Sequence, residues 1–277
     1  MKEQLLAGSM KLLAVLMFGL ASGYALGQAA EPARAGQIDF AVGAATITPL
    51  SGPRIEAREG SIIRSGDTVE TAPGAEVHVK MEDGGYLAVR PSSVLQITSY
   101  VGKGDKDDAL AMSLLKGALR SVTGWIGKIS RRNYRIAIST STIGIRGTDH
   151  EIVHIPADGA APDEIPGTHD RVNRGATYLE KDGKILEIPE GKVGYAGLNG
   201  TLELHEKIPG FLERRRTSNE ERVERYSREI ERHIEEKLRA AGHIKERESA
   251  REFFRRNEER SPNRTRTRER EIRRPER

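Results

Sequence analysis

Between residues 37 and 205, short apolar runs typical of β-strands alternate with turn residues. Glu76–Met81 alternates polar and apolar positions, and Asp83-Gly84-Gly85 separates it from the apolar run Tyr86–Val89, which is a hairpin signal. The other runs of this kind are 94–97, 134–138, 151–155, 177–180 and 184–188, with Asp182-Gly183 turning the last pair. Many short strands with almost no helical periodicity predict an all-β domain, an antiparallel sandwich or roll.

One segment within this region lacks any periodicity. Residues 156–174 contain three prolines, and we expect an exposed loop between two strands there.

The pattern changes at residue 211, where we expect a charged α-helical extension over 211–260. Ser218 and Glu221 have the spacing of a capping box at a helix start. The apolar residues then recur every three or four positions, at Val223, Tyr226, Ile230, Ile234 and Leu238. This stripe could pack on the β-domain, on a partner helix as in a coiled coil, or on a membrane surface. The helix also offers i,i+4 pairs, Glu221/Arg225, Glu224/Arg228 and Glu235/Arg239.

Beyond Pro262 the chain is rich in arginine and almost free of apolar residues. Such a segment cannot bury enough surface to order itself, so we expect residues 261–277 to be a disordered tail.

The N-terminus has the layout of a signal peptide, which we assign to residues 1–30 with cleavage within 25–30. Lys2 and Lys11 precede an apolar run over 12–20, and small residues follow it. The alternative is an uncleaved membrane anchor, but the dense apolar run is about half the roughly 20 residues that a spanning helix needs. We therefore expect a periplasmic or secreted protein, anchored in the inner membrane only if the segment is uncleaved.

Charge is unevenly distributed along the chain. Residues 211–277 hold 22 of the 45 Lys and Arg residues and 16 of the 41 Asp and Glu residues, a balance of +6. The remaining 23 basic and 25 acidic residues give −2. The basicity belongs to the tail, which argues against nucleic-acid binding by the body but allows attraction of the Arg-rich end to anionic envelope polymers. The absence of cysteine excludes disulfides and thiolate chemistry.

The β-rich body resembles the FecR domain family over about residues 60–195. Three segments carry the resemblance: 66–93, which begins Gly-Asp-Thr-Val-Glu-Thr; 114–120, Leu-Leu-Lys-Gly-Ala-Leu-Arg; and 136–148, which ends Gly-Ile-Arg-Gly-Thr. Ser141 departs from the family pattern, which prefers proline there. The motif residues to which we assign a structural role are Gly66, Asp67, Thr71, Asp83, Gly84, Gly117, Arg120, Gly144, Arg146, Gly147 and Thr148.

The resemblance implies a periplasmic β-module. Its better-known members are membrane-spanning regulators of iron-transport sigma factors with a cytoplasmic N-terminal portion, whereas here only eleven residues precede the apolar run. We therefore expect the module without the sigma-regulator activity. Gly66, Gly84, Gly117 and Gly147 are expected at turns or close approaches. Arg146 is expected to be a semi-buried structural arginine, paired with a carboxylate such as Asp149 or Asp67.

The sequence His150-Glu151-Ile152-Val153-His154 matches the H-E-x-x-H pattern of zinc hydrolases, which requires a helix. Its β-branched residues predict a strand instead. On a strand, His150 and His154 share a face about 13 Å apart, and Glu151 points to the other face. A zinc hydrolase is therefore the least favoured function.

Other chemistry is weakly represented. Ser139–Thr142 has no recognisable base in the sequence, and Trp125 is expected to anchor the sheet rather than stack on a ligand. We expect no enzyme activity, cofactor, metal or small-molecule substrate. The favoured function is an exported interaction or scaffold module that binds a protein partner in the bacterial envelope. The alternative is a membrane-anchored signal-transduction regulator that receives a signal from an outer-membrane partner.

Overall fold

The computed structural model describes residues 31–104 and 107–240. Met1–Pro32 forms one unit and Ala33–Arg277 a second, to which the description below applies. The predicted signal peptide, the end of the helical extension and the Arg-rich tail lie outside the described residues. Among the helices that are described, none combines the length and the apolar character needed to cross a membrane.

The strand β9 (Ala109–Val122) is the centre of the sheet system. Its first part pairs with β8 (Val94–Val101) and β10 (Tyr134–Ala137). Its second part pairs with β7 (Tyr86–Val89) and β12 (Asp149–Ile155). Two branches of ladders therefore diverge from one strand, and within the described ranges every ladder except β9–β10 is antiparallel.

Branch A runs in the order β4, β1, β6, β7, β9, β12, β13, β16, β17. Its other members are β4 (Ile62–Arg64), β1 (Arg34–Val42), β6 (Glu76–Met81), β13 (Gly167–Arg174), β16 (Val193–Gly197) and β17 (Leu202–His205). Branch B runs in the order β3, β2, β5, β8, β9, β10, β11, β14, β15. Its other members are β3 (Ile55–Glu56), β2 (Ala45–Thr48), β5 (Thr68–Thr71), β11 (Thr142–Ile145), β14 (Ala176–Lys181) and β15 (Lys184–Pro189).

The main hydrophobic core takes side chains from both branches, among them Val79 and Leu87 of branch A and Leu95 and Ile136 of branch B. Strand alternation explains this, since every second residue of a strand points to the same face. The strands that the sequence predicts are all present, including the hairpin at Asp83-Gly84-Gly85 and the turn at Asp182-Gly183. The β-rich class of the fold is confirmed.

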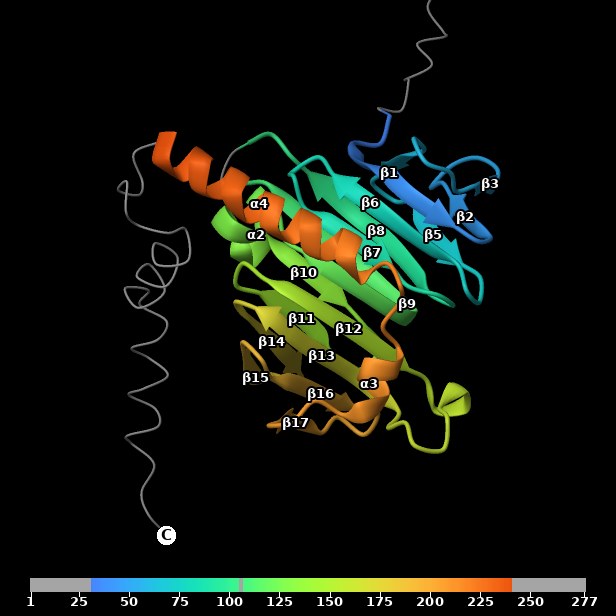
Figure 1. The fold of residues 1–277 in the computed structure, drawn as a ribbon, viewed down its shortest axis with the longest axis vertical. Coiled ribbons are helices and arrows are strands. Elements are labelled where there is room, and N and C mark those ends of the chain that lie inside the picture. The colour runs from blue at the N-terminus through green and yellow to red at the C-terminus, as the bar shows by residue number, and fades with distance from the viewer. Residues whose placement is uncertain (1–30, 105–106, 241–277) are drawn as a thin grey trace, which may run out of the picture. The chain divides into compact units, whose positions relative to one another are not determined.

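Within residues 31–104 and 107–240, three α-helices accompany the strands: α2 (Trp125–Ile129), α3 (Gly210–Arg214) and α4 (Glu220–Ala240). The described part of the chain also has two short 3₁₀ turns, η1 (Arg131–Asn133) and η2 (Ala157–Gly159). Figure 1 shows α4, in orange, lying across one face of the strands. Its apolar stripe packs there on Tyr86, Ala88 and Val122. The sequence leaves three partners open for this stripe, and in the structure the stripe packs on the β-domain.

Trp125 packs in the same place. It lies against the apolar cluster between α4 and the sheet, with Lys237 Nζ 5.5 Å from its ring centroid. The expectation that Trp125 anchors the sheet agrees with this position.

The prediction of a loop over 156–174 is wrong in its second half, because residues 167–174 form strand β13. This strand contains few apolar residues, yet Thr168, His169 and Asp170 are fully buried. Polar contacts inside the structure hold these side chains: Asp170 contacts His150 and Thr177, Thr168 contacts Thr140 and His154, and His169 Nε2 lies 2.9 Å from the carbonyl oxygen of Ile165. A strand buried through polar contacts carries no hydrophobic signal in the sequence.

Gly117 lies where β9 passes from one branch to the other. Its φ of +88° is in the left-handed region that glycine adopts without steric cost. The next residue, Ala118, donates its N–H to Ser93 Oγ at 2.8 Å. A Cβ at position 117 would lie 2.2 Å from Ser93 Oγ and 2.6 Å from Ser93 Cα. The crossing therefore requires glycine both for its backbone angle and for its lack of a side chain.

The substitution Gly117→Ala is expected to lower the free energy of unfolding by roughly 2–5 kcal/mol, since backbone strain and overpacking add. Gly84→Ala is the matched control: φ is +79° there, but a Cβ would meet nothing within 4 Å. Strain alone should cost about 1–2 kcal/mol at that position. Urea unfolding of both variants measures the difference, and equal losses would contradict the role given to the contact with Ser93.

Candidate functional site

The face of branch A beneath α4 carries charged side chains in register across its strands. Arg171, Glu151, Arg120, Ala88 and His78 lie opposite one another on successive strands. In the neighbouring row, Glu76 begins β6 and Arg90 follows β7. We call Glu76, Arg90, Arg120, Asp149 and Glu151, together with Glu220 and Glu224 of α4, the buried ionic cluster.

Arg120 pairs with three carboxylates of this cluster. Its side chain is 1% exposed and forms a bidentate pair with Asp149, with Nε–Oδ1 2.9 Å and Nη2–Oδ2 2.8 Å. It also donates to Glu220 Oε2 at 2.7 Å and Glu224 Oε1 at 2.5 Å. Burial opposes both charges, but these contacts outweigh it, so that the pKa of Arg120 is raised and the pKa of Asp149 is lowered.

Arg90 lies beside Arg120 and is equally buried. It donates from Nη1 to Glu76 Oε1 at 2.7 Å and from Nη2 to Glu220 Oε1 at 2.5 Å. The two oxygens of Glu220 thus bridge the two arginines. Glu76 also contacts His78 Nε2 at 2.6 Å and accepts from Asn219 Nδ2 at 2.9 Å. Although burial works against the charge, His78, Arg90 and Asn219 lower the pKa of Glu76 to about 2.

A third arginine extends the cluster toward the middle of α4. Arg174 Nη1 donates to Ser227 Oγ at 3.0 Å, and its Nη2 lies 3.5 Å from Glu224 Oε2. Ser227 in turn donates to Asp149 Oδ2 at 2.8 Å. The first two turns of α4 therefore contact the sheet through charged and polar groups.

Glu151 is the one carboxylate of the cluster with an unsatisfied oxygen. Its residue exposure is 5%, and Oε1 has no hydrogen-bond partner among the described residues. The nearest cation is Arg90, at 3.6 Å. Burial raises the pKa of Glu151, and the charge of Glu220 adds to that shift although Arg90 opposes it. The cluster is thus incompletely satisfied at this position.

Apolar residues from the first to the fourth turn of α4 also contact this face. Val223, Ile230 and Ile234 are buried against the sheet. The ring of Tyr226 stacks on that of Tyr86 with centroids 4.1 Å apart. Both hydroxyls donate to Asp39, at 2.8 Å and 3.0 Å, and burial together with Asp39 raises the pKa of Tyr226 to about 12.

Arg120 is the family-motif arginine that the structure places in the cluster, and Arg146 is not part of it. The predicted pairing of Arg146 with Asp149 or Asp67 is wrong, because Arg146 pairs with Glu187 at 2.6 Å in a partly exposed position. Asp149 belongs instead to Arg120. Register decides this, since Arg120 and Asp149 lie on adjacent strands of the covered face and Arg146 lies beyond the end of β11.

The other motif residues hold turns and strand ends. Asp67 accepts from Arg64 N–H at 2.8 Å, and Thr71 donates to Arg90 C=O at 2.6 Å. Asp83 accepts from Gly85 N–H at 3.0 Å and Ile126 N–H at 3.2 Å, which joins the β6–β7 turn to α2. Thr148 N–H donates to Thr123 Oγ1 at 2.9 Å.

The four motif glycines expected at turns, Gly66, Gly84, Gly117 and Gly147, all have positive φ, which agrees with that expectation. Gly144 instead lies under the ring of Tyr178, where a Cβ would approach to 2.0 Å.

The H-E-x-x-H segment is a strand, as its β-branched residues predict. His150 Nδ1 lies 2.7 Å from Asp170 Oδ1 with both side chains fully buried, whereas Glu151 faces α4. His154 contacts Thr168 Oγ1 through Nδ1 at 3.0 Å. Across residues 31–104 and 107–240, no group of three or more His, Asp or Glu side chains is arranged to hold a metal ion. The segment lacks the helical geometry of a zinc hydrolase.

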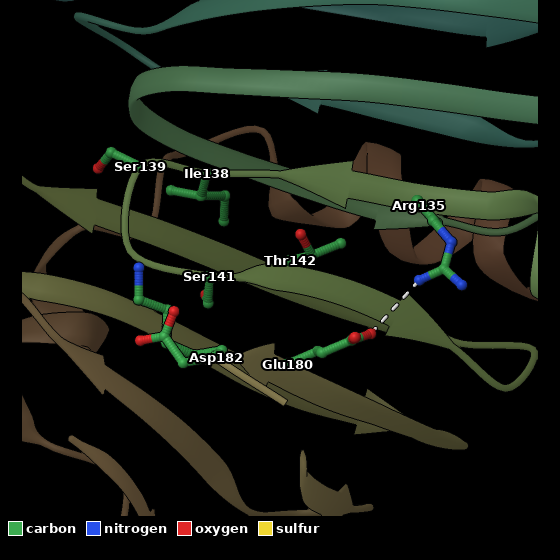
Figure 2. A pocket seen from close by; sticks show the side chains of 8 residues that line it. Arg135, Ile138, Ser139, Ser141, Thr142, Glu180 and Asp182 are labelled. Atoms are coloured by element: carbon green, nitrogen blue, oxygen red, sulfur yellow. Dashed lines mark ion pairs between the residues drawn. The ribbon is translucent and has the colours of Figure 1, made fainter. Parts of the chain in front are cut away.

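Ser139 has a histidine partner that the sequence does not reveal. Its Oγ lies 3.0 Å from His154 Nε2, and burial lowers the pKa of that histidine. Ser139 opens onto a pocket between β10–β11 and β14–β15 that is also lined by Ile138, Arg135 and Glu180, as Figure 2 shows. Arg135 and Glu180 face each other at 3.6 Å across this pocket. The pocket is open and polar, and most of its lining comes from strand ends.

Sequence reasoning missed Arg90, Glu76, Glu220 and Glu224 as partners. It paired Glu224 with Arg228 on the helix surface, whereas Glu224 contacts Arg120 and Arg174 of the sheet. The available signal was position: Glu220 and Glu224 flank Val223, so they belong to the side of the helix that carries the apolar stripe.

Residues 67–161 match the family model described as FecR protein. The described part of the chain is a β-rich domain, and this segment of it is of the FecR family, which confirms the resemblance. No curated protein matches the chain.

Two crystal structures of "a putative anti-sigma factor" from Parabacteroides distasonis are similar to it, with TM-scores of 0.40 and 0.39 and 9% identity. Each alignment covers 53% of this chain and 62% of the other, so the chain spans less than two thirds of those structures. At that level the similarity supports no transfer of activity or partners.

The substitution Arg120→Met should lower the free energy of unfolding by about 3–5 kcal/mol, because it leaves Asp149, Glu220 and Glu224 without their shared cation in a buried site. Arg146→Met is the matched control, since it removes an arginine whose pair with Glu187 is solvent-exposed. Such pairs contribute about 0–1 kcal/mol. Chemical denaturation of both variants tests this, and a loss at Arg120 no larger than at Arg146 would refute the energetic role of the cluster.

Glu151→Gln should stabilise the protein at neutral pH and have little effect in acid. The folded-state pKa of Glu151 is raised, so the wild type loses stability as pH rises through that value, whereas Gln stays neutral. Glu76→Gln should destabilise the protein at neutral pH and have little effect in strong acid. The pKa of Glu76 is about 2 in the folded state against an ordinary 4.5, so the ionised side chain stabilises the fold at neutral pH, and this stabilisation is lost as pH falls from 4.5 to 2. That contribution is on the order of 3 kcal/mol. Unfolding measured from pH 3 to 8 should show opposite trends for the two variants, and parallel trends would contradict this assignment.

Proposed function

We propose that this chain is a non-enzymatic FecR-type module that is exported to the bacterial cell envelope and binds or scaffolds a protein partner there. The observation that carries the proposal is the match of residues 67–161 to the FecR family model. This segment supplies the central strands β6, β7, β9 and β12, together with β8, β10 and β11.

The chemistry of the charged face supports binding over catalysis. Arg90 and Arg120 are paired with carboxylates and covered by α4, so neither is open to a substrate. Buried ion pairs between helix and sheet favour one arrangement of the two. We propose no cofactor and no small-molecule substrate, and the −2 balance of residues 1–210 gives no electrostatic basis for nucleic-acid binding.

The proposed location in the cell envelope rests on the two ends of the chain. In this proposal residues 1–30 are a signal peptide cleaved within 25–30, and 37–205 are the FecR-like β-domain. Residues 211–260 are a charged helical extension, of which α3 and α4 are described. The tail over 261–277 has seven arginines and three glutamates, so it would be attracted to anionic envelope polymers.

The family match favours a second candidate as well. In it, the N-terminal segment remains as an inner-membrane anchor, and the β-domain acts as a signal-transduction regulator that responds to an outer-membrane partner. The two candidates differ in the fate of residues 1–30, so the mass of the N-terminal peptide separates them.

Cell fractionation with mass spectrometry is expected to find the chain in the envelope with a new N-terminus within residues 25–30. A retained Met1 in the inner membrane would favour the regulator. Recovery of the intact chain in the cytoplasm would refute both proposals.

Crosslinking in intact cells tests the partner. The full chain should give a reproducible crosslinked protein, and a variant without residues 2–30 should lose it, because that variant keeps the described domain but not the export signal. A second variant that ends at residue 240 tests the tail. If the variant without residues 2–30 gives the same crosslinks as the full chain, the envelope partner is refuted.

A further inference from the structure

The charged face and the helix that covers it come from different parts of the chain. Glu76, Arg90, Arg120, Asp149 and Glu151 all lie within the FecR-matched residues 67–161. The covering helix α4, residues 220–240, lies outside them. Figure 1 shows this late helix lying across the central strands. The FecR segment thus provides a surface that accepts a helix, and the appended region supplies one.

We propose that this face is a docking site for an amphipathic acidic helix of a protein partner, and that α4 occupies the site in its absence. The inference rests on the proposed function as a protein-binding module and names the surface and the kind of partner. The occupant is defined by the pattern that α4 itself presents to the face.

The arginines of the face determine which positions of a docked helix must be acidic. Glu220 bridges Arg90 and Arg120, and Glu224, one helical turn later, contacts Arg120 and lies near Arg174. Two carboxylates at i and i+4 lie on the same side of a helix and can reach these cations together. A partner helix therefore needs two acidic residues one turn apart, which charge-assisted hydrogen bonds would hold.

The apolar half of the pattern is set by Tyr86, Ala88 and Val122 of the sheet. On α4 these residues are contacted by Val223, Tyr226, Ile230 and Ile234. A matching helix thus carries an aliphatic residue between its two acids and further apolar residues over the next three turns. This combination separates the site from one that recognises acidic chains by charge alone.

Two observations support the proposal that another helix can replace α4 on this face. The hydrogen bonds that the described structure gives between α4 and the strands of the face all join side chains, so another helix with the same side chains could reproduce them. In addition, α4 leaves Glu151 Oε1 buried and without a donor, next to the like-charged Glu220. A partner that supplies a donor at this point would satisfy the face better than α4 does.

A synthetic, fluorescently labelled peptide of residues 217–240 serves as the probe. Because α4 is tethered and therefore at high effective concentration, the intact wild-type chain should bind the peptide weakly. In the full chain with Val223→Asp and Ile230→Asp, α4 is weakened in cis, and saturable binding at least tenfold tighter is expected by fluorescence anisotropy. The matched control peptide, Glu220→Gln with Glu224→Gln, should bind at least tenfold more weakly than the parent peptide.

A cleavable full chain keeps the test valid if the double variant fails to fold. A protease site inserted after Arg216 allows α4 to be separated covalently in the folded protein, and native mass spectrometry should then show the labelled peptide replacing it. Failure of the labelled peptide to enter the cut protein, or equal binding of the parent and control peptides, would overturn the proposal. These measurements use purified protein, so a failure of export or of envelope crosslinking would leave them unaffected.

Discussion

Two arginines buried beneath one helix are the constraint on which the arrangement of this domain depends. Arg90 and Arg120 are both 1% exposed, and removing an ion from water costs several kcal/mol unless it is paired. The sheet supplies only part of the compensation, through Glu76 and Asp149. Glu220 bridges both arginines from α4, and Glu224 adds a further contact to Arg120. The arginines of the face therefore pair with carboxylates of both the sheet and the helix, and each arginine would lose partners if α4 were removed.

The strand β9 makes this face possible by serving both branches. Its alternation sends Leu119 into the shared core and Arg120 toward α4. Gly117 lets the strand change branches, and Ser93 fixes the crossing through the N–H of Ala118. On the face of β12 opposite to Glu151, His150 and Asp170 form a buried polar contact. The domain is thus held by an apolar core between the branches and by two sets of buried polar contacts beside it.

The buried ionic cluster also gives the module a physical basis for selectivity. The apolar contacts of Ile230 and Ile234 would accept many amphipathic helices, whereas the spacing of Arg90, Arg120 and Arg174 accepts only a helix with acids at matching positions. Buried charge discriminates strongly because a mismatched partner leaves an ion unpaired. In the described structure, α4 of the same chain supplies the helix with acids at these positions.

The sequence by itself determined the β-rich class, the positions of most strands, the turns at Gly84 and Gly183, and the FecR resemblance that the match to residues 67–161 confirms. These follow from local alternation and turn chemistry, which neighbouring residues decide. Strand β13 escaped prediction because Val172 is the one large apolar residue it buries, and polar partners of its other buried residues, such as His150, are distant in sequence. The pairing of Asp149 with Arg120 instead of Arg146, and the docking of α4 across 100 residues onto Arg120, were decided only by the tertiary structure. Charge pairing depends on which strands become neighbours. The order of the strands is set by packing between distant segments, which no local sequence pattern predicts.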